Sequence, residues 1–103
     1  MRIVVIVNAR FKAETAEQRR RDHDSIFTRD AIARFQLAGN FSHHAFVRSD
    51  DEREVVAIDM WDRPTLAEVS GFYQDKAFQE AAAATVERVH DMRFYVDHGW
   101  SRF

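Results

Sequence analysis

The sequence predicts an α+β fold in which the elements follow the order β-α-β-β-α-β and the helices cover one face of a four-stranded antiparallel sheet. Three observations support this prediction. The chain opens and closes with strand-like runs, two further strand-like runs form a hairpin in its middle, and helical segments with their own start signals lie on either side of that hairpin. With 103 residues, 46% of them hydrophobic, residues 1–103 are expected to form a single domain around one core.

The first part of the chain supplies one strand and two helical segments. Residues 3–8 are a short run of mostly β-branched side chains, which is typical of a strand covered on both faces. A helix is expected from Thr15, because Thr15 and Gln18 have the spacing at which a hydroxyl and an amide satisfy each other's free helix donors. A second helical stretch begins near Thr28, and Gly39 is its expected terminator.

The middle of the chain holds the predicted hairpin. Residues 41–48 and 54–61 have the composition of strands, and the polar segment 49–53 between them is expected to be a turn outside the core. Pro64 and the Thr65-Leu66-Ala67-Glu68 box that follows it then predict the start of another helix.

A last helical region and a last strand complete the predicted fold. Gly71 is a candidate break in the helix that starts near Thr65, and a further helical run follows it. The apolar side chains of that run form one narrow stripe at helical spacing: Phe78, Ala82, Val86 and Val89. Alternation of apolar and polar side chains over 92–98 predicts the closing strand.

Charge and cysteine content exclude several classes of function. The 15 basic and 17 acidic side chains leave a net charge of −2, so we expect neither a nucleic-acid partner nor an acidic membrane surface. The absence of cysteine excludes disulfides, thiolate metal sites and a cysteine nucleophile, and it fits the reducing cytoplasm. The apolar run near the N-terminus is too short to span a bilayer, so a cytoplasmic protein without a membrane partner is expected.

One face of the predicted sheet has no cover within the chain. Large apolar side chains on it would form an exposed patch greater than monomeric proteins usually carry. A homodimer that packs one open sheet face against the other removes this exposure, so we expect that partner.

A carboxylate inside an apolar strand is the first candidate for chemistry, because a buried carboxylate needs a partner. Asp59 lies between Ile58 and Met60 in the second strand of the hairpin. If the turn centres on residue 51, His43 lies opposite Asp59, whereas a slip of one residue would substitute His44 and reverse the faces. An imidazole beside a carboxylate is suited to act as a general base at neutral pH.

The same residues also allow a purely structural interpretation. His43 and His44 would then be ordinary strand residues, and Asp59 would cap the next helix or pair with an arginine. Trp61 and Tyr73 would belong to the core, as aromatic side chains at regular spacing usually do. No metal site is expected from the two adjacent histidines, because neighbouring strand residues point to opposite faces.

Several local segments, together with the element order, resemble a known superfamily. These segments are Asn8 in the first strand, Met60-Trp61-Asp62 at the end of the hairpin, and residues 71–79 with their aromatic side chains and Phe78. They are similar to the dimeric α+β barrel proteins of ferredoxin-like βαββαβ fold, in particular the antibiotic-biosynthesis-monooxygenase-like group. That group contains cofactor-free monooxygenases, haem degraders, lactone isomerases, polyketide cyclases and proteins without known activity, so the resemblance implies the fold more strongly than the reaction.

Two branches of the superfamily can be compared residue by residue. Haem-degrading members carry an asparagine in the first strand, a tryptophan after the third and an iron-binding histidine on the last helix. Asn8 and Trp61 match, but residues 80–84 offer one carboxylate, four methyl groups and no imidazole, so no haem and no other cofactor is expected. Asn8 then either lines a cavity or ends its strand. The EthD-like proteins, the second choice, place a histidine late in the first helix, where His23 stands.

The resemblance and the residues together lead us to expect a small cofactor-independent enzyme, with monooxygenation of a hydrophobic, aromatic or polyketide-like molecule as the favoured reaction. His43 would be the base, His44 its register-shifted substitute and Asp59 the orienting carboxylate. The expected substrate-binding residues are Asn8, Trp61, Tyr73 and His23. The alternatives are a non-catalytic small-molecule-binding or stress-associated dimer, and an isomerase or cyclase of the same fold. A space between sheet and helices that is filled by phenylalanines would favour the non-catalytic alternative: Phe35, Phe46, Phe78 and Phe94.

Overall fold

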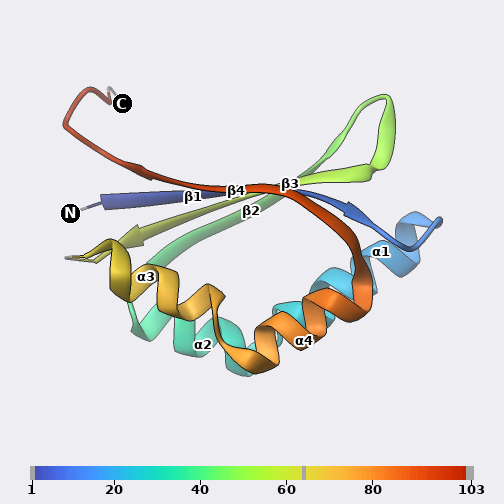
Figure 1. The fold of residues 1–103 in the computed structure, drawn as a ribbon, viewed down its shortest axis with the longest axis horizontal. Coiled ribbons are helices and arrows are strands. Elements are labelled where there is room, and N and C mark those ends of the chain that lie inside the picture. The colour runs from blue at the N-terminus through green and yellow to red at the C-terminus, as the bar shows by residue number, and fades with distance from the viewer. Residues whose placement is uncertain (1, 64, 102–103) are drawn as a thin grey trace.

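A computed structural model describes residues 2–63 and 65–101 and shows an antiparallel sheet with helices on one of its faces (Figure 1). The strands are β1 (Arg2–Phe11), β2 (Asn40–Arg48), β3 (Asp51–Asp62) and β4 (Val86–Val96), and the helices are α1 (Ala16–Ile26), α2 (Arg29–Leu37), α3 (Leu66–Tyr73) and α4 (Lys76–Thr85). The strands lie in the order β2-β3-β1-β4. The predicted βαββαβ order is confirmed, with each helical unit divided into two helices.

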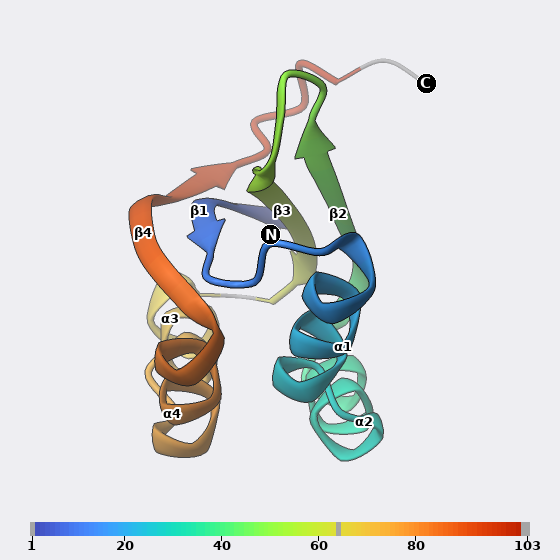
Figure 2. The same cartoon turned by 90° about the vertical axis from the view of Figure 1, so that its right-hand side faces the viewer.

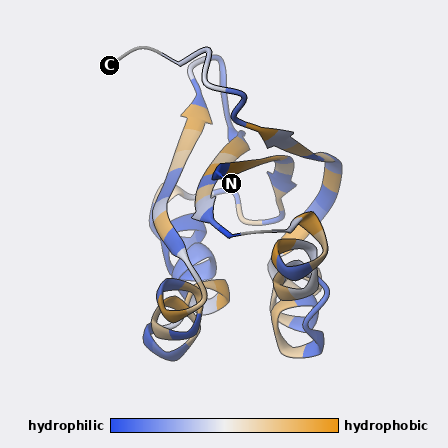
Figure 3. Ribbon diagram, turned by 90° about the vertical axis from the view of Figure 1, so that its left-hand side faces the viewer, coloured by the Kyte–Doolittle hydropathy of each residue, from blue (hydrophilic) through white to orange (hydrophobic). Residues whose placement is uncertain are grey.

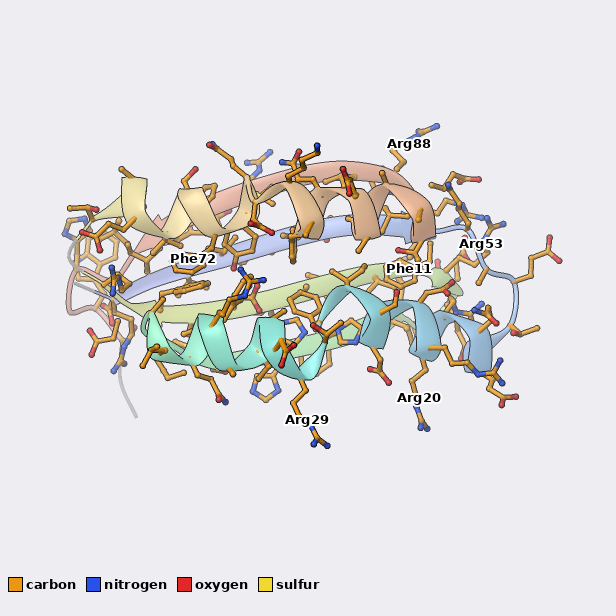
Figure 4. All side chains as sticks on the ribbon, turned by 90° about the horizontal axis from the view of Figure 1, so that it is seen from below. Phe11, Arg20, Arg29, Arg53, Phe72 and Arg88 are labelled. Atoms are coloured by element: carbon orange, nitrogen blue, oxygen red, sulfur yellow. The ribbon has the colours of Figure 1, made fainter. Side chains whose placement is uncertain are left out.

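The helices form two rows under the sheet. Figure 2 shows α1 and α2 on the side of β2, and α3 and α4 on the side of β4. From below, the rows run side by side along the strands (Figure 4). The edge strand β2 and the helices α1 and α2 therefore form one side of the molecule.

Each helix starts at a residue whose side chain accepts a hydrogen bond from a backbone N–H in the first turn. These N-caps satisfy donors that have no partner within the helix. The capping residues are Thr15, Thr28, Thr65 and Asp75. The two capping boxes expected from the sequence are thus helix starts, whereas Pro64 lies outside the described residues.

The core lies between the sheet and the helices because alternate strand residues point toward the helices. Its buried members come from both layers: Ile3, Val5, Phe35, Trp61, Val69 and Tyr73. Figure 3 shows that the strands carry long hydrophobic stretches while the helices alternate between hydrophobic and hydrophilic positions. Burial of one helix stripe against an apolar sheet face is the main stabilising term of such a fold.

The last helix and the last strand differ from the prediction. The helix α4 ends at Thr85, and Val86 and Val89, which were expected on its apolar stripe, belong to β4 instead. Val86 pairs with Phe11 and Val89 with Ala9 of β1. The prediction was wrong because β-branched side chains suit a strand as well as a helix stripe, and pairing with β1 decides between the two.

Two further boundaries also differ. Gly71 does not break the helix that contains it; the break lies at Gln74, directly before the capping residue Asp75. The hairpin turn is shorter than expected, because β3 already begins at Asp51. Arg10 of β1 holds this end of β3 through Asp51, at 2.8 Å, and Glu54, at 3.1 Å.

Gly39 is expected to be sensitive to substitution. It ends the α2 region with a φ of +114°, and a Cβ atom placed there would lie 2.9 Å from the carbonyl oxygen of Asp62 and 2.7 Å from Cδ of Arg63. We expect Gly39→Ala to lower the free energy of unfolding by about 1–3 kcal/mol, measured by urea denaturation. Gly71→Ala is the control, since nothing lies within 4 Å of its Cβ position in a helix, and it should be neutral or stabilising. Equal stability of Gly39→Ala and wild type would contradict the prediction.

The face of the sheet opposite the helices is not covered by any described element (Figure 1). Phe46 and Tyr95 lie on it with 54% and 48% of their surface exposed. Polar pairs lie on the same face, where Asn8 donates to Asp91 at 2.9 Å and His90 lies 2.8 Å from Glu54. Among the described residues, no helix has the length and apolar character needed to span a membrane.

Candidate active site

The register of the hairpin places His43 opposite Asp59, as the sequence predicts for a turn near residue 51. Asp59 pairs on its other side with Val5 of β1, so the carboxylate points into the layer between sheet and helices. His44 pairs with Ile58 and, by the alternation of a strand, belongs to the opposite face of β2.

Asp59 is buried and both of its carboxylate oxygens have partners. Only 1% of its surface is exposed. The Tyr73 hydroxyl donates to Oδ2 at 2.6 Å, and Nδ1 of His43 bonds to Oδ1. Tyr73 in turn accepts a hydrogen bond from Nε1 of Trp61 at 2.9 Å. Two donors on two different oxygens are the arrangement that an ionised carboxylate accepts.

The environment keeps Tyr73 protonated. Burial, together with the charge of Asp59 and the hydrogen bond to it, raises the pKa of Tyr73 well above its ordinary value. Its hydroxyl is therefore a fixed donor to Asp59. The remaining oxygen of Asp59 holds the His43 imidazole in the tautomer with hydrogen on Nδ1, and this leaves the lone pair of Nε2 facing away from the carboxylate.

A second histidine meets His43 from α1. Nε2 of His23 lies 2.9 Å from Nε2 of His43. The ring of Phe27, the residue at the C-terminal end of α1, packs against His43 with ring centroids 4.1 Å apart. Both imidazoles are thus held by an aromatic side chain on one side and by hydrogen bonds at their ring edges.

The two histidines border a cavity of about 450 Å³ between α1 and β2. Apolar side chains from three strands and one helix line much of it: Phe11, Ala16, Ala45, Val47 and Val55. Its polar lining comes from the two histidines, His44, Arg19, Arg20 and Glu52. Arg19 is itself buried and contacts Glu52 at 3.3 Å, whereas Arg20 is directed outward from α1 (Figure 4). A smaller hollow of about 250 Å³ lies on the other side of His43, against α2.

The structure brings most of the predicted site residues into one hydrogen-bonded chain. Its members, in order, are Trp61, Tyr73, Asp59, His43 and His23. Asn8 is not among them, because it lies on the opposite face of the sheet and bonds to Asp91. His44 borders the cavity at the edge of the sheet without joining the chain.

Sequence reasoning named these residues and placed His43 beside Asp59, but it missed the other links. The contact of Tyr73 with Asp59 joins residues 14 positions apart in sequence, and that of His23 with His43 joins residues 20 apart. Arg19, Arg20 and Glu52 were not predicted to line a cavity at all. The sequence does contain one pattern that could have indicated this wall of the cavity. Ala16, Arg20, His23 and Phe27 have helical spacing, which places them on one face of α1.

The four phenylalanines whose packing would favour the non-catalytic alternative fill the interior only in part. Phe35 packs against Phe78 with ring centroids 5.9 Å apart, and Phe94 packs against Tyr73 at 6.1 Å. Phe46 lies on the opposite sheet face. The aromatic cluster fills the space under β1 and β3, and the cavity beside His43 remains open.

The described ranges, 2–63 and 65–101, contain no group of three or more His, Asp or Glu side chains arranged to hold a metal ion. Glu80, in the stretch of α4 where the comparison with haem-degrading proteins would require a histidine, is exposed. The absence of a cofactor stays a prediction.

Comparisons with known proteins agree on the fold. No protein-family model and no curated protein sequence matches this chain. Solved structures match over nearly its whole length. A candidate antibiotic biosynthesis monooxygenase from Nitrosomonas europaea has a TM-score of 0.69 at 14% identity, covering 98% of this chain and 94% of its own. Others from Chloroflexus aurantiacus and Bordetella bronchiseptica have TM-scores of 0.65 and 0.67. The Chloroflexus protein is 12% identical and covers 99% of this chain and 98% of its own. The Bordetella protein is 13% identical and covers 93% of this chain and 96% of its own.

These identities are too low to transfer an activity, but the similarity extends over the same element order and the same sheet. It agrees with the resemblance that Asn8, Trp61 and residues 71–79 indicate in the sequence. The chain therefore has the ferredoxin-like α+β fold of the antibiotic-biosynthesis-monooxygenase-like proteins.

Proposed function

We propose that this protein is a cofactor-independent monooxygenase that acts on an aromatic or polyketide-like small molecule by general-base activation. The observation that carries the proposal is the buried Asp59 carboxylate bonded to His43 at the wall of an open, largely apolar cavity. A carboxylate with 1% exposure is expensive to bury, and the candidate monooxygenases of the same fold supply the reaction class.

The chemistry begins with a proton transfer. The proton of an acidic hydroxyl, or of a methylene beside a carbonyl, passes to the histidines at the cavity wall and comes to rest on His43, where Asp59 holds the ring in place and stabilises the imidazolium. The electron-rich anion then reduces dioxygen directly. For an anthrone, the methylene carbon becomes a carbonyl, one oxygen atom enters the product, and the other leaves as water with the two hydrogens of the methylene. The four electrons released by the carbon are those that dioxygen takes up.

The cavity supports a small aromatic substrate. Its volume of about 450 Å³ falls in the range of small-molecule sites, roughly 300–1,000 Å³. Its apolar walls suit ring systems, and His23 and His43 are polar groups of its lining that can bond to a hydroxyl on such a ring. Trp61 and Tyr73 act behind His43, through Asp59, rather than as cavity walls.

Two alternatives use the same features differently. An isomerase or cyclase would use the His43 base to move a proton without consuming dioxygen. A small-molecule-binding or stress-associated dimer would use the cavity alone. The linked Asp59 and His43 favour an enzyme, because an apolar ligand needs no buried carboxylate behind its site.

Dioxygen uptake by the protein in the presence of a metal chelator tests the proposal against a panel of anthrones, naphthols and hydroquinones. We expect uptake above the uncatalysed rate with at least one of them, and one dioxygen consumed per quinone formed from an anthrone. No uptake with any member of the panel would contradict a monooxygenase and favour the isomerase, cyclase or binding protein.

We also propose that a second copy of the chain covers the open sheet face. Half-exposed Phe46 and Tyr95 on that face support this arrangement, since burying them removes apolar surface from water. Sedimentation equilibrium is expected to give twice the chain mass of 12.1 kDa, and Phe46→Glu should shift the mass toward the monomer. A wild-type mass of one chain at micromolar concentration would contradict the dimer.

A further inference from the structure

The contact between His23 and His43 has the geometry of a direct hydrogen bond from one ring to the other. The two Nε2 atoms are 2.9 Å apart, and the ring centroids are 5.1 Å apart with the ring planes inclined by 20°. A centroid separation of this size requires both nitrogens to lie close to the line that joins the centroids. The lone-pair direction of each Nε2 therefore points at the other Nε2, as an N–H···N bond requires.

A metal ion between the two nitrogens does not fit this geometry. Imidazole nitrogens bind zinc at about 2.0–2.1 Å, so an ion on the line between them would need a nitrogen separation of about 4 Å. The observed 2.9 Å leaves room for a hydrogen atom only.

The position of that hydrogen follows from the partners of His43. Its Nδ1 donates to Asp59, so the neutral ring has a lone pair on Nε2 and must accept. His23 is then the donor, with its hydrogen on Nε2 and a lone pair on Nδ1. The only basic nitrogen that the pair offers outward in this state is Nδ1 of His23.

We propose that His23 accepts the substrate proton on Nδ1 and passes its own Nε2 proton to His43, so that the positive charge comes to rest on His43 beside Asp59. This inference rests on the proposed function. One proton enters at Nδ1 of His23, one crosses between the two Nε2 atoms, and no other bond changes. His43 ends with hydrogens on both nitrogens, and His23 ends neutral with its hydrogen on Nδ1.

Both states keep the two ring nitrogens of His43 hydrogen-bonded. Before the transfer, His43 accepts from His23; after it, His43 donates both to Asp59 and to His23. Oδ1 of Asp24 lies 3.4 Å from Nδ1 of His23 and is placed to accept from it once that nitrogen is protonated. Asp24 is exposed, so the proton can leave to solvent from there.

Burial supports the placement of the charge on His43 rather than on His23. Removal from water, and the nearby His43, lower the pKa of His23, although Asp24 opposes this effect. His23 is therefore kept neutral, as both states require. The charged and titratable groups around the pair are Asp59 and Glu52 from β3, Tyr73 from α3, His44 from β2, and Arg19, Arg20 and Asp24 from α1.

Nitrogen NMR of the full-length protein labelled with ¹⁵N-histidine tests the pair without any substrate. His23→Gln and His43→Gln variants assign the signals. We expect a nitrogen–nitrogen coupling across the hydrogen bond between the two Nε2 atoms. On acidification, the hydrogen should move from Nε2 of His23 to Nε2 of His43 while Nδ1 of His23 gains one. Absence of the coupling, or a His23 ring that gains its second hydrogen while His43 stays neutral, would overturn the inference.

Kinetics test the transfer itself with a substrate that the wild-type protein oxidises. His23→Ala should lower kcat on the order of 10²-fold, and added imidazole, which can occupy the vacated space and carry the proton, should restore part of it. Unchanged kcat in His23→Ala would overturn the relay. If the wild type oxidises no substrate while the coupling is present, the proposed function fails and the hydrogen-bonded pair stands.

Discussion

His43→Gln is expected to lower the rate of substrate-dependent dioxygen uptake on the order of 10²–10⁴-fold. Glutamine has a similar reach and can still donate an amide N–H to Asp59, but it has no nitrogen that accepts a proton near neutral pH. The buried carboxylate keeps a partner, so the fold should be retained. Initial rates of uptake with the best substrate of the panel, measured alongside urea denaturation, check both parts of this expectation.

His98→Gln is the matched control for this variant. His98 is exposed in the segment after β4, away from the cavity lining, so the same substitution there should leave the rate unchanged. Wild-type uptake in a folded His43→Gln variant would remove His43 from the mechanism. A fall of equal size in His98→Gln would show that the loss is not specific to the site.

Tyr73→Phe is expected to lower the free energy of unfolding by about 2–3 kcal/mol at neutral pH. The hydroxyl of Tyr73 donates to Asp59 at 2.6 Å and accepts from Trp61 at 2.9 Å. Phenylalanine fills nearly the same volume but leaves a buried carboxylate oxygen and a buried indole N–H without their partner. Breaking a buried bond to a charged group costs more than the net value of an ordinary hydrogen bond.

The effect of Tyr73 on stability should disappear in strong alkali. Its pKa is raised in the folded state, whereas an unfolded tyrosine loses its proton near pH 10. Above that pH the unfolded state binds fewer protons than the folded state, so wild-type stability falls by about 1.4 kcal/mol per pH unit from this group. Tyr73→Phe lacks this ionisable hydroxyl, so its own stability does not fall for this reason. The difference in free energy of unfolding between the variant and wild type should therefore shrink as pH rises above about 10.

Tyr95→Phe is the control for Tyr73→Phe. Tyr95 is 48% exposed on the opposite sheet face, and its substitution should change the free energy of unfolding at neutral pH by no more than about 0.5 kcal/mol. Urea denaturation between pH 7 and pH 11 measures the stability of Tyr73→Phe and of wild type, and at pH 7 that of Tyr95→Phe. Equal stability of Tyr73→Phe and wild type at pH 7 would contradict the role assigned to the hydroxyl.

Much of the fold is predictable from local patterns. Cap signals at Thr15 and Thr65 locate two helix starts, and the hairpin register that places His43 against Asp59 follows from the position of one polar turn. These features are determined by residues close in sequence. The side of the sheet that each strand residue faces then follows from alternation alone.

What the sequence does not predict depends on contacts between distant segments. Val86 and Val89 fit a helix stripe as well as a strand, and only pairing with β1 decides between them. The meeting of His23 with His43 depends on how α1 lies across β2, which no local pattern specifies. The side of the sheet that Asn8 faces, by contrast, follows from strand alternation. Its neighbour Val7 packs on the core, so Asn8 itself must face the other side of the sheet.

The most direct test of the central claim is the oxidation of an anthrone under ¹⁸O₂ by the chelator-treated protein, with His43→Gln measured beside it. The account predicts one ¹⁸O atom in each quinone molecule, one dioxygen consumed per product, and loss of both in the variant. Product oxygen that comes from water, or labelled product formed at the same rate by His43→Gln, would contradict it.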